Sequence, residues 1–431
     1  MIKSSGYNIY VGNNNTGGIV YNSLSHQYLQ LPPKKWNVSV KGNALVADSF
    51  THDDIDILCE KGFFVDTEID EFAIACSRKM SSRLDKRAFH IIVNPTLDCN
   101  LRCWYCYESH KKGTRISDDR IESIKKLIAW KYKEDNFKDL SLSFFGGEPM
   151  MGASKVLSLI DSAKYFCEQN EINLHVSFTT NGTLLSEKVL EQLNGIPTSL
   201  QITIDGSKEQ HNKTRGSKLF DSYEVIWKNI KKISQRLSNV FFIIRINYDE
   251  NTFKKADSLI EDIFKIEQSK VKISVQKIWQ VDSGKINYDQ VFNFIKQLSD
   301  AGYQTDFLDL SPQISTTCYA DKLNSLIINY DGLVYKCTAR DFNEGNCVGK
   351  LEPNGLVSYD YERLKKYVFA DYFDKCKSCS LFPSCYGICS QGVIENNSDC
   401  ALVAGFSIQD YVWFNYKYRF LKPTSNIGRI E

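Results

Sequence analysis

Strand-like and helix-like segments alternate six times between residue 89 and about residue 280. Each strand-like segment is a short apolar run rich in β-branched and aromatic residues, and amphipathic helical stretches separate the runs. This alternation predicts an α/β fold in which a parallel sheet curves into a partial (β/α)6 barrel. The six strand-like segments are residues 89–95, 140–149, 174–182, 199–206, 239–249 and 270–279.

Polar residues follow the predicted strands at the points where a TIM-like barrel carries its chemistry. In such barrels, active-site residues gather at the carboxyl ends of the strands. One polar residue after a strand is an ordinary turn feature, but five successive strand ends of this kind indicate a single site. Besides a cysteine loop after the first strand, the candidates are Gly146, Gly147, Glu148, Asn181, Asp205 and Arg245.

The cysteine loop, CNLRCWYC, carries Cys99, Cys103 and Cys106 at spacing C-x3-C-x2-C. A structural zinc site uses four ligands, and disulfides need paired cysteines. A 4Fe–4S cluster usually takes four thiolates, so three cysteines leave one iron open. The loop therefore predicts a metal centre whose remaining ligand comes from elsewhere.

These three cysteines, with the aromatic Tyr105 before the last of them, resemble the cysteine motif of the radical S-adenosylmethionine (SAM) enzymes. The resemblance implies that SAM binds the open iron through its amino and carboxylate groups. It also implies that an electron from the cluster cleaves SAM to a 5′-deoxyadenosyl radical. That radical would remove a hydrogen atom from the substrate.

Other residues of the barrel agree with this resemblance. The segment GGEP resembles the family motif whose backbone groups and glutamate, here Glu148, contact the SAM ammonium. A carboxylate forms a strong, charge-assisted hydrogen bond with an ammonium. Arg215, in IDGSKEQHNKTRG, and Arg245 are competing partners for the SAM carboxylate, because a guanidinium binds a carboxylate bidentately. An ordinary ion pair is the alternative for each arginine.

Eight of the 14 cysteines follow residue 300, in a pattern that resembles the SPASM extension with its two auxiliary 4Fe–4S clusters. With the cluster at the Cys99 loop, the expected total is three clusters. The resemblance implies that the distal cluster is bound by Cys376, Cys379, Cys385 and Cys400. It implies that the proximal cluster is bound by Cys318, Cys337 and Cys389. Cys347 is either the fourth proximal ligand or a thiol beside an iron left open for a substrate thiolate.

Residues 1–88 are expected to form a separate N-terminal unit. Strand-like runs around GNNNTGG precede a helix with a capping box of Thr51 and Asp54, and Gly62 ends that helix. The unit resembles a winged-helix-like, peptide-binding module, and a packing appendage is the alternative. The further domains expected are a radical SAM barrel over 89–300, a SPASM domain over 301–405 and a C-terminal extension over 406–431.

The combined resemblance implies a peptide maturase that installs an intramolecular crosslink, either a thioether or a carbon–carbon bond, in a ribosomally made precursor peptide. A sulfatase-maturase-like enzyme that forms formylglycine is the alternative. Such enzymes usually carry an aspartate where this chain has Thr338, although Asp341 lies nearby as a possible proton acceptor or a turn residue. A non-catalytic protein that binds zinc or iron–sulfur clusters is the alternative of another class.

Composition narrows the partners that are expected. The net charge of +1 argues against a broad nucleic-acid footprint, and no apolar run is long enough to predict a membrane span. The N-terminus lacks the apolar core of a secretory signal, so a cytoplasmic protein with thiols and metal ligands is expected. The partners expected are a precursor peptide with a leader and a small redox protein as electron donor. Cys59, Cys76 and Cys167 are expected to be structural.

Overall fold

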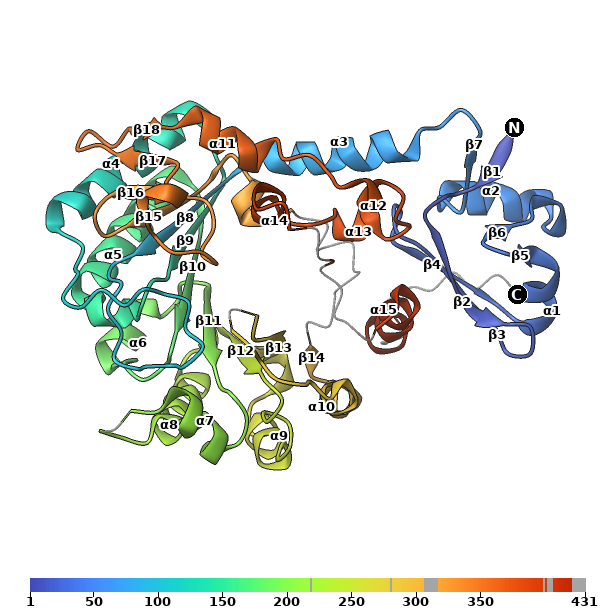
Figure 1. Cartoon of the computed structure of the whole chain (residues 1–431). Coiled ribbons are helices and arrows are strands. Elements are labelled where there is room, and N and C mark those ends of the chain that lie inside the picture. The colour runs from blue at the N-terminus through green and yellow to red at the C-terminus, as the bar shows by residue number, and fades with distance from the viewer. Residues whose placement is uncertain (218, 280, 306–316, 398–399, 401–405, 421–431) are drawn as a thin grey trace. The chain divides into compact units, whose positions relative to one another are not determined.

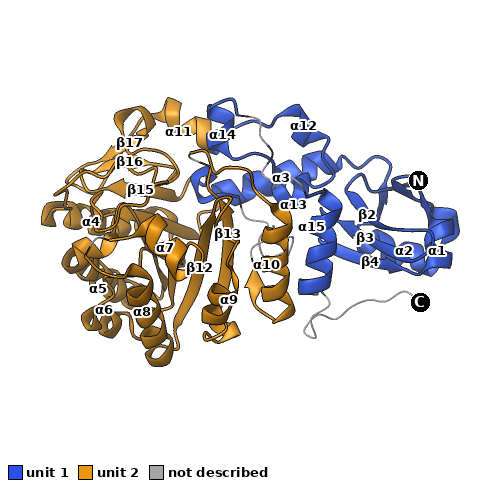
Figure 2. Cartoon of the chain, turned by 60° about the horizontal axis from the view of Figure 1, so that its bottom comes forward, with its two compact units in different colours: residues 1–84, 308–322, 368–431 blue, residues 85–307, 323–367 orange. Residues whose placement is uncertain are grey.

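The computed structural model describes the chain except residues 218, 280, 306–316, 398–399, 401–405 and 421–431. The chain forms two compact units, drawn in blue and orange in Figure 2. Unit 1 comprises residues 1–84, 308–322 and 368–431, and unit 2 comprises residues 85–307 and 323–367. The cysteine-rich region after residue 300 is therefore shared between the units. The expected functional boundaries after residues 88, 300 and 405 stay predictions.

Unit 2 is built on an 11-stranded sheet in the order β14-β13-β12-β11-β10-β9-β8-β15-β16-β17-β18. The strands from β14 to β15 pair in parallel, and β15 to β18 pair antiparallel. All six predicted strands are present, so the predicted α/β fold is confirmed. The strands are β8 (Ala88–Asn94), β9 (Asp139–Phe144), β10 (Asn173–Thr180), β11 (Thr198–Thr203), β12 (Val240–Tyr248), β13 (Val271–Lys277), β14 (Gln304–Thr305), β15 (Ser325–Asn329), β16 (Leu333–Tyr335), β17 (Gly349–Leu351) and β18 (Val357–Tyr359).

Helices connect the parallel strands of unit 2, as Figure 1 shows. The first of them illustrates why: the Ser117 side chain caps its N-terminus by accepting from Arg120 N at 3.2 Å, and its buried stripe includes Ile121, Ile124 and Ile128. The helices are α4 (Asp118–Asp135), α5 (Ala153–Asn170), α6 (Glu187–Leu193), α7 (Lys208–Arg215), α8 (Ser222–Arg236), α9 (Asp257–Ile263) and α10 (Tyr288–Asp300).

The two faces of this sheet differ in polarity. In β12, Phe242 and Ile244 are fully buried, whereas Arg245 and Asn247 on the opposite face are half-buried. Arg245 lies in register with Thr203 on one neighbouring strand and with Ser274 on the other, so the polar row crosses the sheet. Further half-buried polar residues of this face are His90, Ser141, Ser143, His175, Ser177, Thr179, Ser199 and Gln201. A closed TIM barrel fills its interior mainly with apolar side chains, whereas this face carries these polar side chains beside the apolar Phe241 and Ile243.

Unit 1 begins with three small antiparallel sheets and three helices. The capping box of Thr51 and Asp54 is present, and Gly62 lies just after the helix with φ +79°, as predicted. The strands are β1 (Ile2–Ser4) paired with β7 (Phe64–Asp66), the meander β2 (Asn8–Asn13), β3 (Gly17–Asn22) and β4 (Gln27–Leu31), and β5 (Val40–Lys41) paired with β6 (Ala44–Leu45). The helices are α1 (Pro33–Ser39), α2 (His52–Glu60) and α3 (Glu71–Leu84). The winged-helix-like character of this segment stays a prediction.

The N-terminal segment of unit 1 contacts its C-terminal, cysteine-rich segment directly. The Tyr21 hydroxyl hydrogen-bonds to the Ser384 hydroxyl at 3.0 Å, and the Ser23 hydroxyl donates to the carbonyl of Ser380 at 2.5 Å. Near the end of the chain, the Tyr416 hydroxyl hydrogen-bonds to the side chain of Gln30. The helices of this segment are α11 (Tyr361–Val368), which begins in unit 2, α12 (Asp374–Lys377), α13 (Phe382–Cys385), α14 (Ser390–Ile394) and α15 (Ile408–Asn415).

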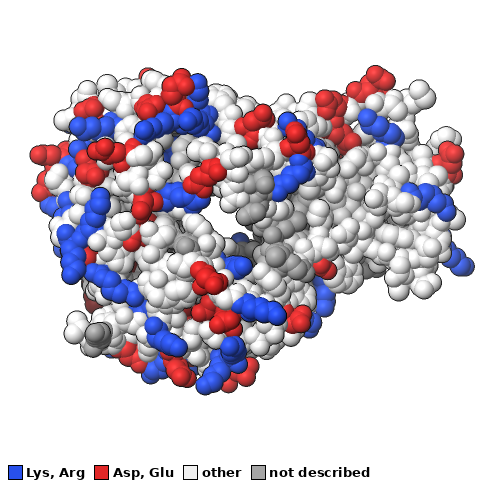
Figure 3. Space-filling view, in the orientation of Figure 1, with Lys and Arg blue, Asp and Glu red and all other residues white. Residues whose placement is uncertain are grey.

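Two properties of the whole chain concern its expected partners. Among the described residues, none of the helices is both long and apolar enough to cross a membrane. On the face drawn in Figure 3, basic and acidic side chains are interspersed, consistent with the near-zero net charge of the sequence.

Candidate active site

The cysteine loop follows β8 directly and is held by hydrogen bonds to its thiols. Cys99 Sγ accepts from Leu101 N at 3.4 Å and from Asn181 Nδ2 at 3.7 Å, and Cys106 Sγ hydrogen-bonds to His110 Nε2 at 3.4 Å. Burial raises the pKa of both Cys99 and Cys103 to about 11. These thiols therefore keep their protons at neutral pH until a metal displaces them.

The two glycines of GGEP brace the start of this loop. A Cβ atom on Gly146, whose φ is +104°, would lie 2.3 Å from the carbonyl oxygen of Thr96, and one on Gly147 would lie 2.2 Å from that of Asp98. The backbone N–H of Gly147 donates a hydrogen bond to the carbonyl of Thr96, and that of Glu148 donates to the carbonyl of Asp98. Glycine is required at both positions because the two backbone segments touch.

Glu148 is fully buried and nearly saturated with hydrogen bonds. One carboxylate oxygen accepts from Met150 N at 3.0 Å and from the Thr180 hydroxyl at 2.8 Å, and the other accepts from Asn181 N at 2.7 Å. Burial raises its pKa, and these donors partly offset the rise. A carboxylate offers about four acceptor positions, so one remains on the oxygen that binds Asn181. A single ammonium donor fits that position.

Tyr105, within the cysteine loop, is the centre of a buried hydrogen-bond network. Its hydroxyl donates to Asp205 at 2.5 Å and accepts from Arg215 at 2.7 Å and from Asn247 at 3.0 Å. Arg215 also lies 3.6 Å from Asp205, and both side chains are at least nine-tenths buried. Arg215 is thus neutralised by a carboxylate of its own chain. The backbone N–H of Asp205 donates to His211 Nδ1 at 3.2 Å, which completes the network.

Arg245 has a different environment from Arg215. It is half-buried on the polar face of the sheet, and its Nε donates to the Asn247 side chain at 2.8 Å. Within the described ranges, no carboxylate lies within ion-pair distance of its guanidinium. Arg245 therefore presents free donors beside the network of Tyr105, which is the property that an anion-binding arginine needs.

A second set of contacts joins the cysteine loop to residues 340 and 341. Of this set, the sequence indicates only Asp341. The Ser109 hydroxyl of the cysteine loop donates to Asp341 at 2.7 Å. The Arg340 guanidinium lies 4.9 Å from the ring centre of Trp279, and that ring lies 5.9 Å from Tyr107. Trp279 is half-exposed and is the last residue of the predicted strand 270–279, so its place at a strand end was the signal that could have identified it.

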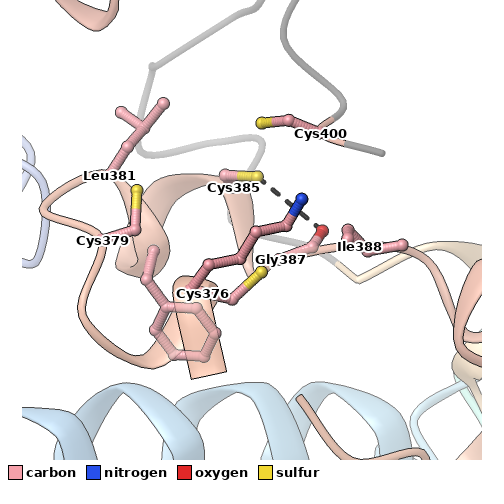
Figure 4. Close-up of a pocket in the computed structure, with 9 residues that line it drawn as sticks. Cys376, Cys379, Leu381, Cys385, Gly387, Ile388 and Cys400 are labelled. Carbon is pink, nitrogen blue, oxygen red and sulfur yellow. Dashed lines mark hydrogen bonds between the residues drawn. The ribbon is translucent and has the colours of Figure 1, made fainter. Parts of the chain in front are cut away.

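The four cysteines assigned to the distal cluster line one cavity of about 90 Å³ in unit 1. Figure 4 shows the sulfurs of Cys376, Cys379, Cys385 and Cys400 around it, with Leu381 and Ile388 in the lining. The donor set fits a 4Fe–4S cluster, which binds each thiolate to a different iron. Among the described residues, no three Cys, His, Asp or Glu side chains converge closely enough for a single metal ion.

The cysteines assigned to the proximal cluster belong to different units. Cys318 and Cys389 are exposed residues of unit 1, whereas Cys337 and Cys347 are half-buried residues of unit 2. Cys347 donates its thiol hydrogen to the carbonyl of Gly349 at 3.0 Å. The proximal ligand set stays a prediction. Cys59 and Cys167 lie among apolar neighbours on α2 and α5, as expected of structural thiols.

Residues 93–263 match the family described as the Radical SAM superfamily. The chain therefore contains a radical SAM domain, and the resemblance inferred from the cysteine loop is confirmed. The chain is 24% identical over 391 residues to the radical SAM cyclopropyl synthase TigE of Paramaledivibacter caminithermalis, covering 81% of this chain and 78% of that relative. It is 24% identical over 368 residues to the cysteine-type anaerobic sulfatase-maturating enzyme of Clostridium perfringens, covering 76% of this chain and 96% of that relative.

The solved structure of Streptococcus suis SuiB bound to the precursor peptide SuiA resembles this fold with a TM-score of 0.53. The similarity covers 92% of this chain and 98% of SuiB at 16% identity, which shows a shared fold. The family match and these relatives agree with the resemblance to the radical SAM enzymes that the cysteine loop indicated.

Proposed function

We propose that this protein is a radical SAM peptide maturase that installs an intramolecular thioether or carbon–carbon crosslink in a ribosomally made precursor peptide. The observation that carries the proposal is the grouping of three kinds of side chain at one end of a parallel sheet. These are the three loop thiols, a buried carboxylate with one free acceptor position, and an arginine that no carboxylate of the described residues pairs with.

Cys99, Cys103 and Cys106 would hold a 4Fe–4S cluster. Glu148 offers its remaining acceptor position to the SAM ammonium, and Arg245 offers its free donors to the SAM carboxylate. Arg215 is already paired with Asp205, so we assign it a structural role. It holds the cysteine loop by donating a hydrogen bond to the Tyr105 hydroxyl. When bound, the cluster and SAM supply a 5′-deoxyadenosyl radical that removes a hydrogen atom from the substrate.

A peptide substrate is supported by the polar sheet face and by its rim. The half-buried row that includes Ser177, Thr179 and Gln201 offers hydrogen-bonding partners for a peptide backbone. Trp279 and Arg340 at the rim offer apolar and cationic contacts for side chains. The relation to SuiB, whose structure contains a precursor peptide, points to the same class of substrate. We propose that residues 1–88 bind the leader and that a small redox protein supplies the electron.

Formation of formylglycine is the second candidate, and one contact favours it. Thr338 stands where sulfatase maturases usually carry an aspartate, but Asp341 is hydrogen-bonded to Ser109 of the cysteine loop. A carboxylate in that position could accept the proton released when a substrate cysteine or serine is oxidised. The 96% coverage of the sulfatase-maturating relative agrees with this candidate.

The cofactor part of the proposal is tested by anaerobic purification, iron and sulfide analysis and a visible spectrum. We expect iron and sulfide for three clusters, and 5′-deoxyadenosine when SAM and a reductant are added. Replacing Cys99, Cys103 and Cys106 together by alanine should remove about four irons and stop SAM cleavage. A colourless, zinc-loaded protein would show a non-catalytic scaffold instead.

The reaction is tested by mass spectrometry of a precursor peptide after incubation with enzyme, SAM and reductant. A crosslink removes a pair of hydrogen atoms from the peptide and leaves no free aldehyde. Conversion of cysteine to formylglycine removes sulfur and creates an aldehyde that a hydrazide probe captures. Asp341→Asn should abolish only the second outcome, whereas it should leave crosslinking measurable.

A further inference from the structure

Lys79 on α3 is a buried cation that has no carboxylate partner among the residues that the structure describes. Only 2% of its surface is exposed. Its ammonium donates to the carbonyl oxygen of Tyr386 at 2.7 Å and lies 4.6 Å from the ring centre of Tyr372. No Asp or Glu of the described chain lies within ion-pair distance of it. Burying an ammonium without a negative partner has a large desolvation free energy, and a nearby anion would offset it.

The nearest other charges do not provide that anion. Arg83, one turn further along α3, is also buried and is 3.5 Å from the buried Asp321, which therefore balances Arg83. The sum of these three charges is one uncompensated positive charge. Burial and the Arg83 charge lower the pKa of Lys79 to about 8, which still leaves the ammonium protonated at neutral pH.

The distal cysteine cavity lies next to this cation. Tyr386, which accepts from Lys79, directly follows Cys385 in the chain and precedes Gly387, another residue that lines the cavity. On the α3 side, Ala75 belongs to the same apolar cluster as Cys376 and Phe382. Figure 4 shows the light-blue ribbon of α3 running beside the cavity.

We infer that Lys79 is the buried counter-ion of the 4Fe–4S cluster held by Cys376, Cys379, Cys385 and Cys400, and that it raises the reduction potential of this cluster. The assignment rests on the proposed function, which supplies the cluster. Four thiolates give such a cluster a net negative charge, and one-electron reduction makes it more negative. A fixed cation in a low-dielectric setting stabilises the reduced form more than the oxidised form. Lys79 would thus be a positioning and tuning residue and not a catalytic one.

The test compares Lys79→Met with Lys377→Met in the full chain after anaerobic reconstitution. Lys377 is a matched control because it adjoins Cys376 but is exposed and paired with Asp374 at 3.1 Å. Both variants are made in a background in which Cys99, Cys103 and Cys106 are alanine, so only auxiliary clusters give a signal. The readout is a redox titration followed by electron paramagnetic resonance.

We expect Lys79→Met to lower the equilibrium constant for reducing one auxiliary cluster at least tenfold, a shift of about 59 mV to more negative potential for a one-electron couple. Lys377→Met should leave the midpoint potentials of both auxiliary clusters at their parent values. Lys79→Arg, which keeps the positive charge, should also keep the parent midpoint potential. Equal midpoints in the two methionine variants would overturn the role of Lys79.

Iron analysis keeps the test decisive if a variant loses its cluster. Loss of about four irons in Lys79→Met, with retention in Lys79→Arg, supports the counter-ion role because only the charge differs strongly between the two. Loss in both variants would show a packing role and overturn the inference. A parent protein with no auxiliary iron at all would instead contradict the proposed clusters themselves.

Discussion

Arg215 and Arg245 carry the same guanidinium but have different surroundings in this fold. Arg215 is buried against Asp205, so Arg215→Gln would leave that carboxylate unpaired in the interior. Removing one partner of a buried pair typically costs ~3–5 kcal/mol. We expect Arg215→Gln to lower the free energy of unfolding by about that amount, as measured by denaturant titration.

Arg245→Gln should leave the free energy of unfolding nearly unchanged, because no carboxylate of the described chain lies within ion-pair distance of its guanidinium. A hydrogen bond to a charged group contributes ~1.5–3 kcal/mol, so we expect SAM to bind roughly 10- to 150-fold more weakly. Equilibrium binding of SAM to the reconstituted protein measures this. If Arg215→Gln instead weakened SAM binding and Arg245→Gln instead destabilised the fold, the SAM carboxylate would be assigned to Arg215.

His211 gives the fold a specific pH dependence. Burial and the neighbouring Arg215 lower its pKa from 6.5 to about 3, so the folded protein keeps His211 neutral while the unfolded chain protonates it. The stability that depends on this residue is therefore present above about pH 6.5 and is lost as the pH falls towards about 3. We expect His211→Asn, which keeps an acceptor for Asp205 N, to reduce the stability difference between about pH 7 and about pH 5. Identical pH profiles for the two proteins would show that His211 is protonated in the folded state.

Cys347 tests the fourth ligand of the predicted proximal cluster. Its thiol now donates to the carbonyl of Gly349, and a ligand thiolate would give up that hydrogen bond. If Cys347 is a ligand, Cys347→Ser should perturb the paramagnetic signal of one auxiliary cluster and leave the Cys99-loop cluster intact. Unchanged resting spectra, together with a shift on adding a cysteine-bearing peptide, would favour an open iron and thioether chemistry.

At the scale of elements, the turn after β9 fixes the cysteine loop by direct backbone contact. A methyl group on Gly147 would lie 2.2 Å from the carbonyl oxygen of Asp98. The turn and the cysteine loop cannot move apart without breaking the hydrogen bond from the backbone N–H of Glu148 to that same carbonyl. Forcing an extra methyl into packed structure costs ~1–3 kcal/mol. We expect Gly147→Ala to destabilise the protein by that amount and to lower iron binding at the loop.

Gly6→Ala is the matched control for this substitution. Its added methyl would meet only Glu71, at an ordinary contact distance of 3.7 Å. Thermal unfolding and iron analysis of both variants provide the comparison. Equal behaviour of the two would show that the loop does not need the close approach at Gly147.

At the scale of the whole molecule, the predicted leader-binding role of residues 1–88 cannot be separated from the auxiliary cluster by truncation. The segment packs on the loop that carries Cys385, through Tyr21, Ser23 and Lys79, so its removal would also uncover that loop. Hydrogen exchange of the full chain with and without the precursor peptide avoids this problem. We expect the leader to slow exchange within residues 1–84. Protection confined to residues 85–307 and 323–367 would assign the peptide to unit 2 alone.

The sequence by itself determined the strand order along the chain, the parallel sheet and the cysteine loop at its carboxyl edge. Those features depend on local periodicity and on the rule that parallel strands place their ends at one edge, both of which a single sequence displays. The capping box at Thr51 and the N-cap at Ser117 were readable for the same reason, because their hydrogen bonds span three residues.

Only the tertiary structure decided which arginine has a carboxylate partner, because Asp205 follows β11, Arg215 ends α7 and Arg245 lies on β12, and their distances depend on how these elements pack. It likewise decided that β15, 325–329, pairs with β8 across more than two hundred residues, and that α3 brings Lys79 to the distal cysteines. Contacts between distant segments follow from how buried surfaces pack and how buried charges are balanced. Local periodicity carries no record of either, since each side of such a contact is compatible with many partners until the chain has folded.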